Sequence, residues 1–388
     1  TGEGGRIEAC AEQAGRTGPG LPLLRKSRPD VADHVSGSGA LNVDLGFVGR
    51  VAGPVDPSKA SSIRLRGPWG SMRLPVEGLR HEAIPEDIFA GLQLDCSALS
   101  PATLAPIVGV IAASPPARPA SASIAYRNLA LPATASTGIV VPFYRAFDYL
   151  PNLPRTLAPV GPEIELTVVC DDPGLADDLV VWTRSWNDAV YRVPMQVLVH
   201  DHNAGFAAAC NTGWRATSSA LVLLLNSDIL VYDPVRDLAR LADGVGGGVV
   251  ATAPVLLFPD GTLQHAGMEM VDAPDFPGFV LPGHPGKHGP ADLLPAGPFD
   301  VPMLTGAAVC VGRDDLEAVG GVPVVFGRGD FEDVLLSLAL RDRGRLTVDP
   351  AVRWTHMEGA SYRRAELGGI ALTLAKSVVV GERTGGRR

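Results

Sequence analysis

The chain after residue 134 carries short, mostly apolar runs that are rich in β-branched residues or Leu, unlike the regular alternation of a strand with one face in water. Four such runs have the sequences TGIVVPF, IELTVVC, MQVLVH and SALVLLLN. The segments between them are long enough for helices, and strands that are apolar on both faces are typical of parallel sheets covered on both sides. The pattern therefore predicts a doubly wound, mostly parallel α/β domain over residues 133–388.

The residues before this domain show a different pattern. Between residues 39 and 132, stretches such as SSIRLRG, SMRLPVEG and ASIAYRNLAL alternate polar and apolar positions and are separated by Gly and Pro. Short alternating strands between turn residues predict a small all-β, sandwich-like accessory domain. Residues 1–38 are rich in Gly, Arg, Ser and Glu without an apolar period, so we expect a flexible segment there.

Composition narrows the classes of function. The chain has 388 residues, of which 46% are hydrophobic, and a net charge of -9. It can therefore bury a sizeable core, but it lacks the basic surface that binds nucleic acid. Its five cysteines are scattered singly, which favours reduced thiols and a cytoplasmic location. The most apolar run, residues 103–113, is too short to span a bilayer. The chain begins without Met or a signal-like segment, and one interpretation is a piece of a longer polypeptide.

Polar residues follow each of the four apolar runs, where the strands are expected to end. In such sheets ligands bind at the carboxyl ends of the strands. The candidates in chain order are Tyr144, Arg145, Asp171, Asp172, residues 200–205 and residues 226–228. A carboxylate carried out of a buried strand suits a cleft, but Asp is also common in turns and helix caps. The pattern leaves both interpretations of Asp228 open, and Asp171 and Asp172 equally fit a plain Asp-Asp-Pro-Gly turn.

A second group of acidic residues begins a predicted helix further along the chain. Glu332 and Asp333 open the stretch EDVLLSLALRDRG, which we expect to end at Gly344. Negative side chains in the first turn are stabilised by the helix dipole, which would help to keep Asp333 ionised. An ionised Asp in that place suits a general base and equally an ordinary helix cap.

Eight motifs occur in order along the predicted α/β domain: VVPFYRAFDYLPNLPRTL, VVCDDPG, NAGFAAACNTGWRAT, LLLNSD, FPDGTLQHAG, LTGAAVCV, GDFED and HMEGAS. Together they resemble glycosyltransferase family 2 of the GT-A fold, and in particular its rhamnosyltransferase-like branch. The resemblance spans about residues 138–362 and does not reach residues 1–130. The resemblance implies inverting transfer of a sugar from a nucleotide-sugar donor, UDP- or dTDP-linked, to a hydroxyl of a glycan or lipid-linked acceptor. It also implies a divalent cation, Mg²⁺ or Mn²⁺, on the donor phosphates.

The resemblance also implies a role for each candidate residue. Asp228 matches the carboxylate of a DxD-like triplet and would bind the metal, and His356 stands where a histidine completes that site. Asn226, first in the triplet, would bond to ribose or to a metal-bound water. Asp333 would be the general base, and Glu332 would orient the acceptor or a neighbouring group. The residues implied to contact the nucleotide and the sugar are Tyr144, Arg145, Asp171, Asp172, Asn203, Gly205 and Asn211.

One departure and several alternatives stand beside this resemblance. Leu335 and Ala339 occupy the places of an acid and a later Arg, which suggests that an internal ion pair was lost as a unit. His356 also fits a core or cap histidine at a strand end. A non-catalytic glycan-binding or scaffolding protein is the leading alternative function. A nucleotidyltransferase is the other, but VVPFYRAFDYL lacks its basic, Gly-rich triphosphate loop. The apolar tail ending in Arg387 and Arg388 leaves peripheral membrane contact open.

Overall fold

The computed structural model describes residues 119–128, 135–145, 147–357 and 369–384, with seven short strands before residue 76 and a few residues between 99 and 108. The chain divides into two compact units. Unit 1 comprises Thr1–Pro115, Asp272–Val280 and Arg364–Arg383, and unit 2 comprises Pro116–Val271, Leu281–Arg363 and Thr384–Arg388.

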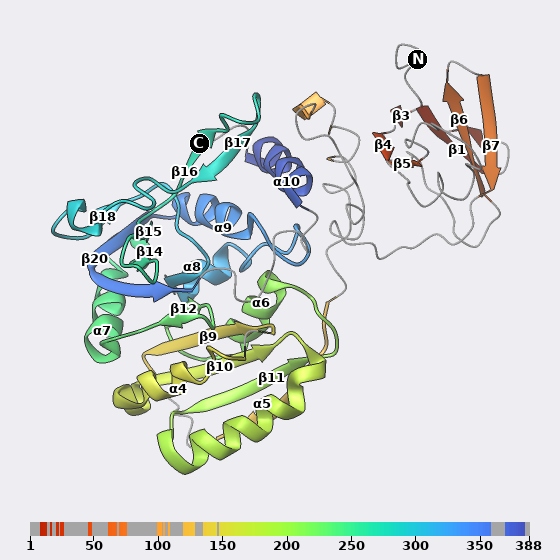
Figure 1. Ribbon diagram of the computed structural model, residues 1–388. Helices are drawn as coiled ribbons and strands as arrows, with labels where there is room; N and C mark the ends of the chain where they lie inside the picture. Colours follow the sequence, from red (N-terminus) through yellow and green to blue (C-terminus); the bar gives the residue numbers. More distant parts are fainter. Residues whose placement is uncertain are drawn as a thin grey trace. The chain divides into compact units, whose positions relative to one another are not determined.

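Unit 2 is built on an 11-stranded mixed sheet with helices on both faces (Figure 1). Its centre is parallel, because β9 pairs in parallel with β10 and β12, and β10 with β11. The strands of this sheet are β8 (Ala122–Arg127), β9 (Thr137–Phe143), β10 (Ile164–Cys170), β11 (Met195–His200), β12 (Leu221–Leu225), β13 (Ile229–Leu230), β14 (Val249–Leu257), β15 (Leu263–His265), β18 (Phe299–Asp300), β19 (Ala308–Gly312) and β20 (Arg345–His356). A separate pair consists of β16 (Glu269–Asp272) and β17 (Val280–Gly283).

The uninterrupted apolar runs are explained by two cores, one on each face of the sheet. On β9, Ile139 and Phe143 face the core that contains Leu153 of α4, whereas Val140 faces the core that contains Trp214 of α6. Helices α5 and α7 join the first core, and helices α8 and α9 join the second. The α-helices are α4 (Asn152–Leu157), α5 (Ala176–Thr183), α6 (Phe206–Ala216), α7 (Pro234–Gly244), α8 (Arg313–Ala318) and α9 (Glu332–Arg341). They are joined by the 3-10 helices η2 (Ala158–Glu163), η3 (Pro173–Leu175) and η5 (Ala291–Leu293) and by the π-helix η4 (Arg184–Tyr191). The predicted α/β architecture, with strands buried on both sides, is confirmed.

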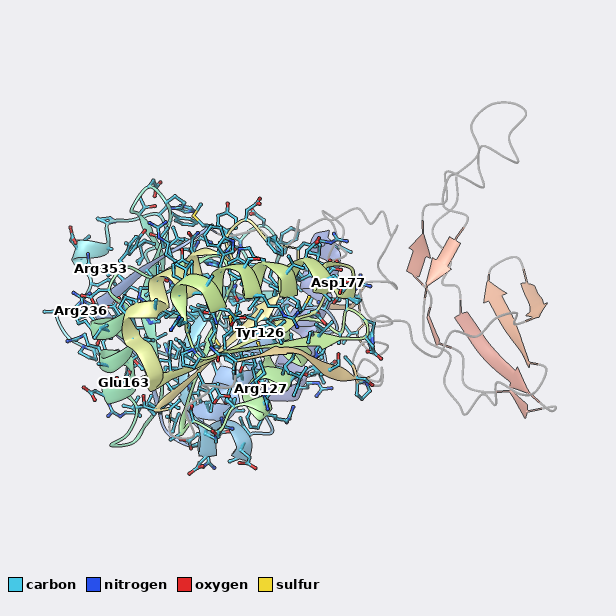
Figure 2. The ribbon with its side chains drawn as sticks, turned by 90° about the horizontal axis from the view of Figure 1, so that it is seen from below. Tyr126, Arg127, Glu163, Asp177, Arg236 and Arg353 are labelled. Atoms are coloured by element: carbon cyan, nitrogen blue, oxygen red, sulfur yellow. The ribbon has the colours of Figure 1, made fainter. Side chains whose placement is uncertain are left out.

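The predicted domain boundary at residue 132 was wrong. Strand β8 pairs antiparallel with β11, so it belongs to unit 2, which begins at Pro116. Strand β8 is only partly covered: Tyr126 is buried, whereas its neighbour Arg127 is exposed. Both side chains are labelled in Figure 2, and the Tyr126 hydroxyl donates a hydrogen bond to Asp188. A half-buried edge strand alternates like the strands of an all-β domain, which explains the misplaced boundary.

The strands described in unit 1 form antiparallel ladders. Strand β1 pairs with β2, β3 and β6, β6 pairs with β7, and β4 pairs with β5. Their bounds are β1 (Glu8–Gln13), β2 (Arg16–Thr17), β3 (Leu21–Pro22), β4 (Leu24–Lys26), β5 (Gly46–Val48), β6 (Ser61–Gly67) and β7 (Gly70–Pro75). Antiparallel pairing fits the predicted accessory domain, much of which lies outside the described residues. However, β1 to β4 lie where we expected a segment without structure, because EACAEQ has only Ala and Cys as apolar residues and gives a weak periodic signal.

The chain ends in helix α10 (Gly369–Thr384), most of which is assigned to unit 1. Within the part of the chain that the structure describes, no helix combines the length and the apolar character needed to cross a membrane. The three cysteines whose side chains are described, Cys170, Cys210 and Cys310, are free and buried, as predicted.

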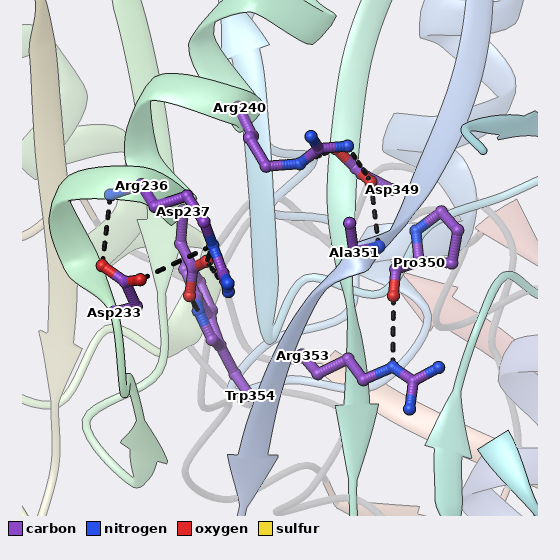
Figure 3. A network of polar contacts seen from close by, with 9 residues as sticks. All are labelled: Asp233, Arg236, Asp237, Arg240, Asp349, Pro350, Ala351, Arg353 and Trp354. Atoms are coloured by element: carbon purple, nitrogen blue, oxygen red, sulfur yellow. Dashed lines mark hydrogen bonds and ion pairs between the residues drawn. The ribbon is translucent and has the colours of Figure 1, made fainter. Parts of the chain in front are cut away.

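A network of polar side chains anchors helix α7 to β20 (Figure 3). The Arg240 guanidinium donates to both carboxylate oxygens of Asp349, at 2.9 and 3.0 Å. The indole of Trp354 donates to Asp237 at 2.9 Å, and both of these side chains are buried. Removing the partner of a buried carboxylate, such as Asp237 or Asp349, is costly. The network therefore fixes β20 as far as Trp354. The candidate site residue His356 lies two residues further on, at the end of this strand.

Candidate functional site

The carboxyl ends of β9, β10 and β12 surround a hollow of about 90 Å³. The predicted site residues that line it are Tyr144, Asp171, Asn226 and Asp228, and two residues that were not predicted, Phe206 and Ser227, line it as well. Because the strands are parallel, their carboxyl ends meet at one edge of the sheet. This edge therefore brings together four candidates from three separate stretches of sequence.

Strand pairing brings Asp228 and His356 together. Strand β13 runs antiparallel to the end of β20, with Ile229 opposite His356. As a result, His356 Nε2 lies 3.3 Å from Asp228 Oδ1, and both side chains are largely buried. The backbone N–H of Met357 also donates to the Asp228 carbonyl at 3.1 Å. The structure therefore brings together a carboxylate and an imidazole that the sequence assigned to one site only through the family resemblance.

Asn226 adds a third polar atom to this edge. Its backbone N–H donates to the Ala307 carbonyl at 2.8 Å, but its side-chain Oδ1 is buried and has no hydrogen-bond partner among the described residues. An unsatisfied buried acceptor costs about 1–3 kcal/mol, unless something absent from the protein chain bonds to it. No cluster of three or more His, Cys, Asp or Glu side chains in the described part of the chain could hold a metal alone. The pair suits a cation that is also bound by a phosphate ligand.

Asp333 lies in the first turn of α9, as predicted. Its carboxylate accepts hydrogen bonds from the backbone N–H groups of Gly306, at 3.1 Å, and Val334, at 2.8 Å. Burial raises the pKa of Asp333 to about 6, and the nearby charge of Asp330 also raises it, whereas the two N–H groups act in the opposite direction. The carboxylate is thus mostly ionised at neutral pH and still basic enough to take a proton. Helix α9 ends at Arg341, with Gly344 in the turn that follows.

One short turn connects the base candidate with the metal candidate. In residues 305–307, the Gly306 N–H bonds to Asp333, and the Ala307 carbonyl accepts from Asn226. A Cβ added at Gly306 would lie 3.3 Å from the ring of Phe206, which lines the hollow, and 3.4 Å from Cβ of Asp333. The turn therefore sets the position of the Asp333 carboxylate beside the hollow, a role that the sequence did not indicate.

The backbone is strained just before these acids. Asp330 and Phe331 have φ values of 81° and 71°, in the left-handed region that residues other than Gly rarely adopt. Strain of this kind costs about 1–3 kcal/mol per residue and is often found at functional sites. Glu332 follows, and its carboxylate lies on the side of Gly329, where an added Cβ would be 3.8 Å from Oε1. Glu332 and Asp333 thus point in different directions, as expected for adjacent residues of a helix.

Asp171 is buried and bonded to its own chain. Its carboxylate accepts from the backbone N–H groups of Ala204, at 2.9 Å, and Gly205, at 2.8 Å, and from the His200 ring at 2.7 Å. Asn203 Oδ1 also accepts from Gly205 at 3.1 Å. Gly205 has a φ of 92°, and an added Cβ would lie 2.5 Å from a neighbouring backbone oxygen. These contacts fix the loop before α6, and the backbone of Gly205 packs closely against the backbone of its own chain at Gly327.

Two other candidates, Arg145 and Asp172, are not among the residues that line the hollow. Arg145 is exposed and stacks on the ring of Tyr144, with 4.8 Å from Cζ to the ring centre. Asp172 accepts from the Gly174 N–H at 3.1 Å and begins the turn η3, which matches the plain-turn interpretation of this acid.

Asn211 is a correction to the predicted donor contacts. It lies within α6 and is buried, and its amide donates to the Val322 carbonyl at 2.6 Å. Its Oδ1 accepts from the Val322 N–H and from the Trp214 indole, both at 2.9 Å. The side chain therefore joins α6 to a loop that lies 111 residues away in sequence. The resemblance identified Asn211 by residue type, which does not reveal the face of the helix on which it lies.

Gln264 was not predicted, although the motif FPDGTLQHAG was recognised. Its Oε1 lies 2.7 Å from His356 Nδ1, on the side of the ring away from Asp228. The only signal in the sequence was an amide residue within this motif.

The comparisons with known proteins agree with this geometry. Residues 138–276 match the family model described as glycosyl transferase family 2. This segment contains the hollow, the Asn226–Asp228 triplet and Gln264. This part of the α/β domain is therefore similar to glycosyltransferase family 2, in agreement with the resemblance of the motifs.

Two relatives are similar over part of their length. The O-antigen biosynthesis protein RfbC of Myxococcus xanthus is 31% identical over 247 residues, which cover 59% of this chain and 18% of that protein. The uncharacterized protein y4gI of Sinorhizobium fredii is 28% identical over 207 residues, covering 50% of this chain and 21% of that protein. The chain thus spans about a fifth of the length of these curated relatives.

Solved structures of glycosyltransferases are more distant. GalNAc-T7 with UDP, GalNAc and Mn²⁺ matches with a TM-score of 0.43 and 15% identity, over 57% of this chain and 44% of that one. The mannosyltransferase PcManGT of Pyrobaculum calidifontis, in complex with GDP-Man and Mn²⁺, matches with a TM-score of 0.39 and 17% identity, over 57% and 56% of the chains. The similarity to glycosyltransferase family 2 rests on the match of residues 138–276 to the family model and not on these structures.

Proposed function

We propose that this chain is an inverting glycosyltransferase that moves a sugar from a nucleotide-sugar donor to a hydroxyl of a glycan or lipid-linked acceptor. The observation that carries the proposal is the contact of Asp228 with His356 at 3.3 Å, at the edge of a hollow beside the unpartnered Asn226 Oδ1. The match of residues 138–276 to the family model supports the type of reaction. The likeness to an O-antigen biosynthesis protein supports a polysaccharide acceptor and action in the cytoplasm, with or without peripheral contact to a membrane.

A divalent cation, Mg²⁺ or Mn²⁺, would be held by Asp228 and His356. The donor set fits, because a carboxylate oxygen and an imidazole nitrogen are within the range of ligands that these ions accept, and donor phosphates supply further oxygens. When bound, the cation would stabilise the negative charge that develops on the diphosphate leaving group. Asn226 Oδ1 would accept a hydrogen bond from ribose or from a bound water.

Asp333 would act as the general base. Its carboxylate takes the proton of the acceptor hydroxyl as the hydroxyl oxygen attacks the anomeric carbon, and the bond to the diphosphate breaks on the opposite face. Attack from the opposite face inverts that centre. A pKa of about 6 supports this role, since a base works best when its pKa lies near the operating pH. Glu332 would orient the acceptor or a group beside it.

The donor nucleotide, UDP or dTDP, would lie against Tyr144 and Arg145. Tyr144 lines the hollow, and the exposed guanidinium stacked on it would face the nucleotide. Asp171, Asn203 and Gly205 would contribute through the loop that they hold in place, and Asp172 would contact the nucleotide from the turn.

A thermal-shift experiment tests this proposal. The purified chain is heated with UDP-, dTDP- and GDP-sugars, with and without Mn²⁺. We expect one nucleotide class to raise Tm in a metal-dependent manner, because a ligand at 100 times its Kd stabilises the folded state by about 2.7 kcal/mol. Asp228→Ala should abolish the metal-dependent part of the shift.

Asp233→Ala is the matched control for this experiment. Asp233 lies five residues further on, is half exposed, and caps α7 by accepting from the Arg236 N–H. It should keep the full metal-dependent shift. No shift of the parent chain with any donor would argue against the proposed enzyme and in favour of a non-catalytic glycan-binding role.

A further inference from the structure

The ring of His356 is held from two sides by groups of different kinds. Nε2 faces Asp228 Oδ1 at 3.3 Å, and Nδ1 faces Gln264 Oε1 at 2.7 Å. A histidine that binds a metal through one nitrogen usually donates the N–H of its other nitrogen to a neighbouring acceptor. The second contact therefore bears directly on how the first nitrogen can act.

The side chain of Gln264 can be oriented from its second contact. Its Nε2 lies 3.4 Å from the His356 carbonyl oxygen, which can only accept a hydrogen bond. The amide nitrogen must therefore face that carbonyl, and Oε1 must face the ring. Since Oε1 cannot donate, His356 Nδ1 carries the hydrogen. In the neutral ring, Nε2 then keeps its lone pair, which points toward Asp228.

Strand β15 gives Gln264 a rigid base. Its residues on either side are tied to other strands and loops: Leu263 exchanges hydrogen bonds with Gly289, at 2.8 Å, and His288, at 2.7 Å. His265 pairs with Leu256 of β14, and its Nε2 accepts from the backbone at Gly267. Gln264 itself is only 4% exposed. Because its strand is held in this way, the Gln264 side chain can hold the His356 ring in one orientation.

We propose that Gln264 is a positioning residue of the metal site, which holds His356 in the tautomer and ring orientation that leave Nε2 free to bind the divalent cation. This inference rests on the proposed function, because it assumes that Asp228 and His356 bind a metal. Gln264 touches neither the cation nor the substrate in this scheme, and it acts only through His356.

The test combines Mn²⁺ binding with the state of the ring. Mn²⁺ is titrated into the full chain in the presence of UDP, dTDP or GDP in turn, and free Mn²⁺ is measured by electron paramagnetic resonance. Loss of an outer partner of a metal-binding histidine typically weakens metal affinity about 10- to 100-fold, and we expect this for Gln264→Leu. Gln264→Glu, whose carboxylate still accepts from Nδ1, should lose less Mn²⁺ affinity than Gln264→Leu.

Nuclear magnetic resonance of ¹⁵N-histidine, without metal, gives a second measurement. The parent chain should show His356 with its hydrogen on Nδ1, and Gln264→Leu should lose this preference. The His356→Ala variant assigns the signal among the eight histidines. A residue that only stabilised the fold would not change this tautomer.

Gln196→Leu is the matched control. Gln196 is also a buried glutamine on a strand, and its amide donates to Thr167 at 3.0 Å and to the Ala216 carbonyl at 3.1 Å. Its loss should destabilise the fold to a similar degree and leave Mn²⁺ affinity unchanged.

The outcomes separate the two proposals. If the parent chain binds Mn²⁺, Asp228→Ala loses it, and Gln264→Leu binds as tightly as the parent, the role of Gln264 is refuted and the proposed function stands. Equal weakening in Gln196→Leu and Gln264→Leu, with an unchanged tautomer, also refutes that role. If the parent chain does not bind Mn²⁺ with any nucleotide, the metal site itself is wrong, and the role of Gln264 falls with it.

Discussion

Asp333→Asn is expected to lower the rate of sugar transfer about 100- to 10,000-fold while the domain stays folded. The amide fills the same space but cannot take the proton from the acceptor hydroxyl. In the parent chain, the rate should rise with pH through about 6, as the Asp333 carboxyl loses its proton, and then level off. Initial rates with the donor identified by thermal shift, measured from pH 5 to 8, test this expectation.

Asp314→Asn is the control for this variant. Asp314 is an acid in the first turn of α8, as Asp333 is in α9, but it is exposed. If Asp333 served only as a helix cap, both variants would have small and similar effects on the rate. A variant at Asp333 that kept most of its activity would contradict its role as the base.

The same pKa shift predicts how stability changes with pH. The folded state raises the pKa of Asp333 from 3.8 to about 6, so it holds this proton more tightly than the unfolded chain does. The stabilisation is complete below pH 4 and is lost as pH rises through 6. Relative to Asp333→Asn, the parent should therefore lose about 1–3 kcal/mol of unfolding free energy between pH 4 and 7, a range that allows for screening by solvent. Urea unfolding of both chains across this range provides the measurement.

Asp171→Ala is expected to lower the free energy of unfolding by about 3–5 kcal/mol. The substitution removes the acceptor for two buried N–H groups, at Ala204 and Gly205, and for the ring of His200. The loop before α6 should lose its fixed position, and donor binding should weaken as a secondary effect. Chemical unfolding measures the first effect, and a nucleotide titration at low temperature measures the second.

The neighbouring residue provides the comparison. Asp172→Ala removes one hydrogen bond to Gly174 in a more exposed turn, so we expect a loss of about 0.5–2 kcal/mol. If Asp171→Ala were as stable as the parent and lacked only nucleotide binding, direct contact with the nucleotide would replace the structural role argued for this carboxylate.

Much of the α/β fold could be predicted because a strand that is buried on both faces has apolar residues at most of its positions. Val140 and Phe143 point to opposite faces of β9, and each face has its own core, so the run contains no polar position inside it. The edge strand β8 lacks this pattern. Because it is only partly covered, it alternates like the strands of unit 1, and its pairing with β11 could not be inferred from its own residues.

The sequence could predict those candidate site residues that directly follow the carboxyl end of a parallel strand. Asp228 and Tyr144 lie at the hollow because the carboxyl ends of parallel strands meet at one edge. Gln264 could not be predicted, because its contact with His356 joins residues 92 positions apart through the pairing of three strands. Asn211 was misplaced for a related reason: a motif match does not say whether a helical residue faces a ligand or the interior.

The strained turn before α9 has a consequence for adaptation. Asp330 has two effects. Its left-handed φ of 81° costs folding energy, and its charge raises the pKa of the Asp333 carboxyl. Glycine accepts that backbone conformation freely and carries no charge. An aspartate codon becomes a glycine codon by one base change. A single substitution of Asp330 by Gly could therefore relieve the backbone strain and lower the pH above which Asp333 is ionised.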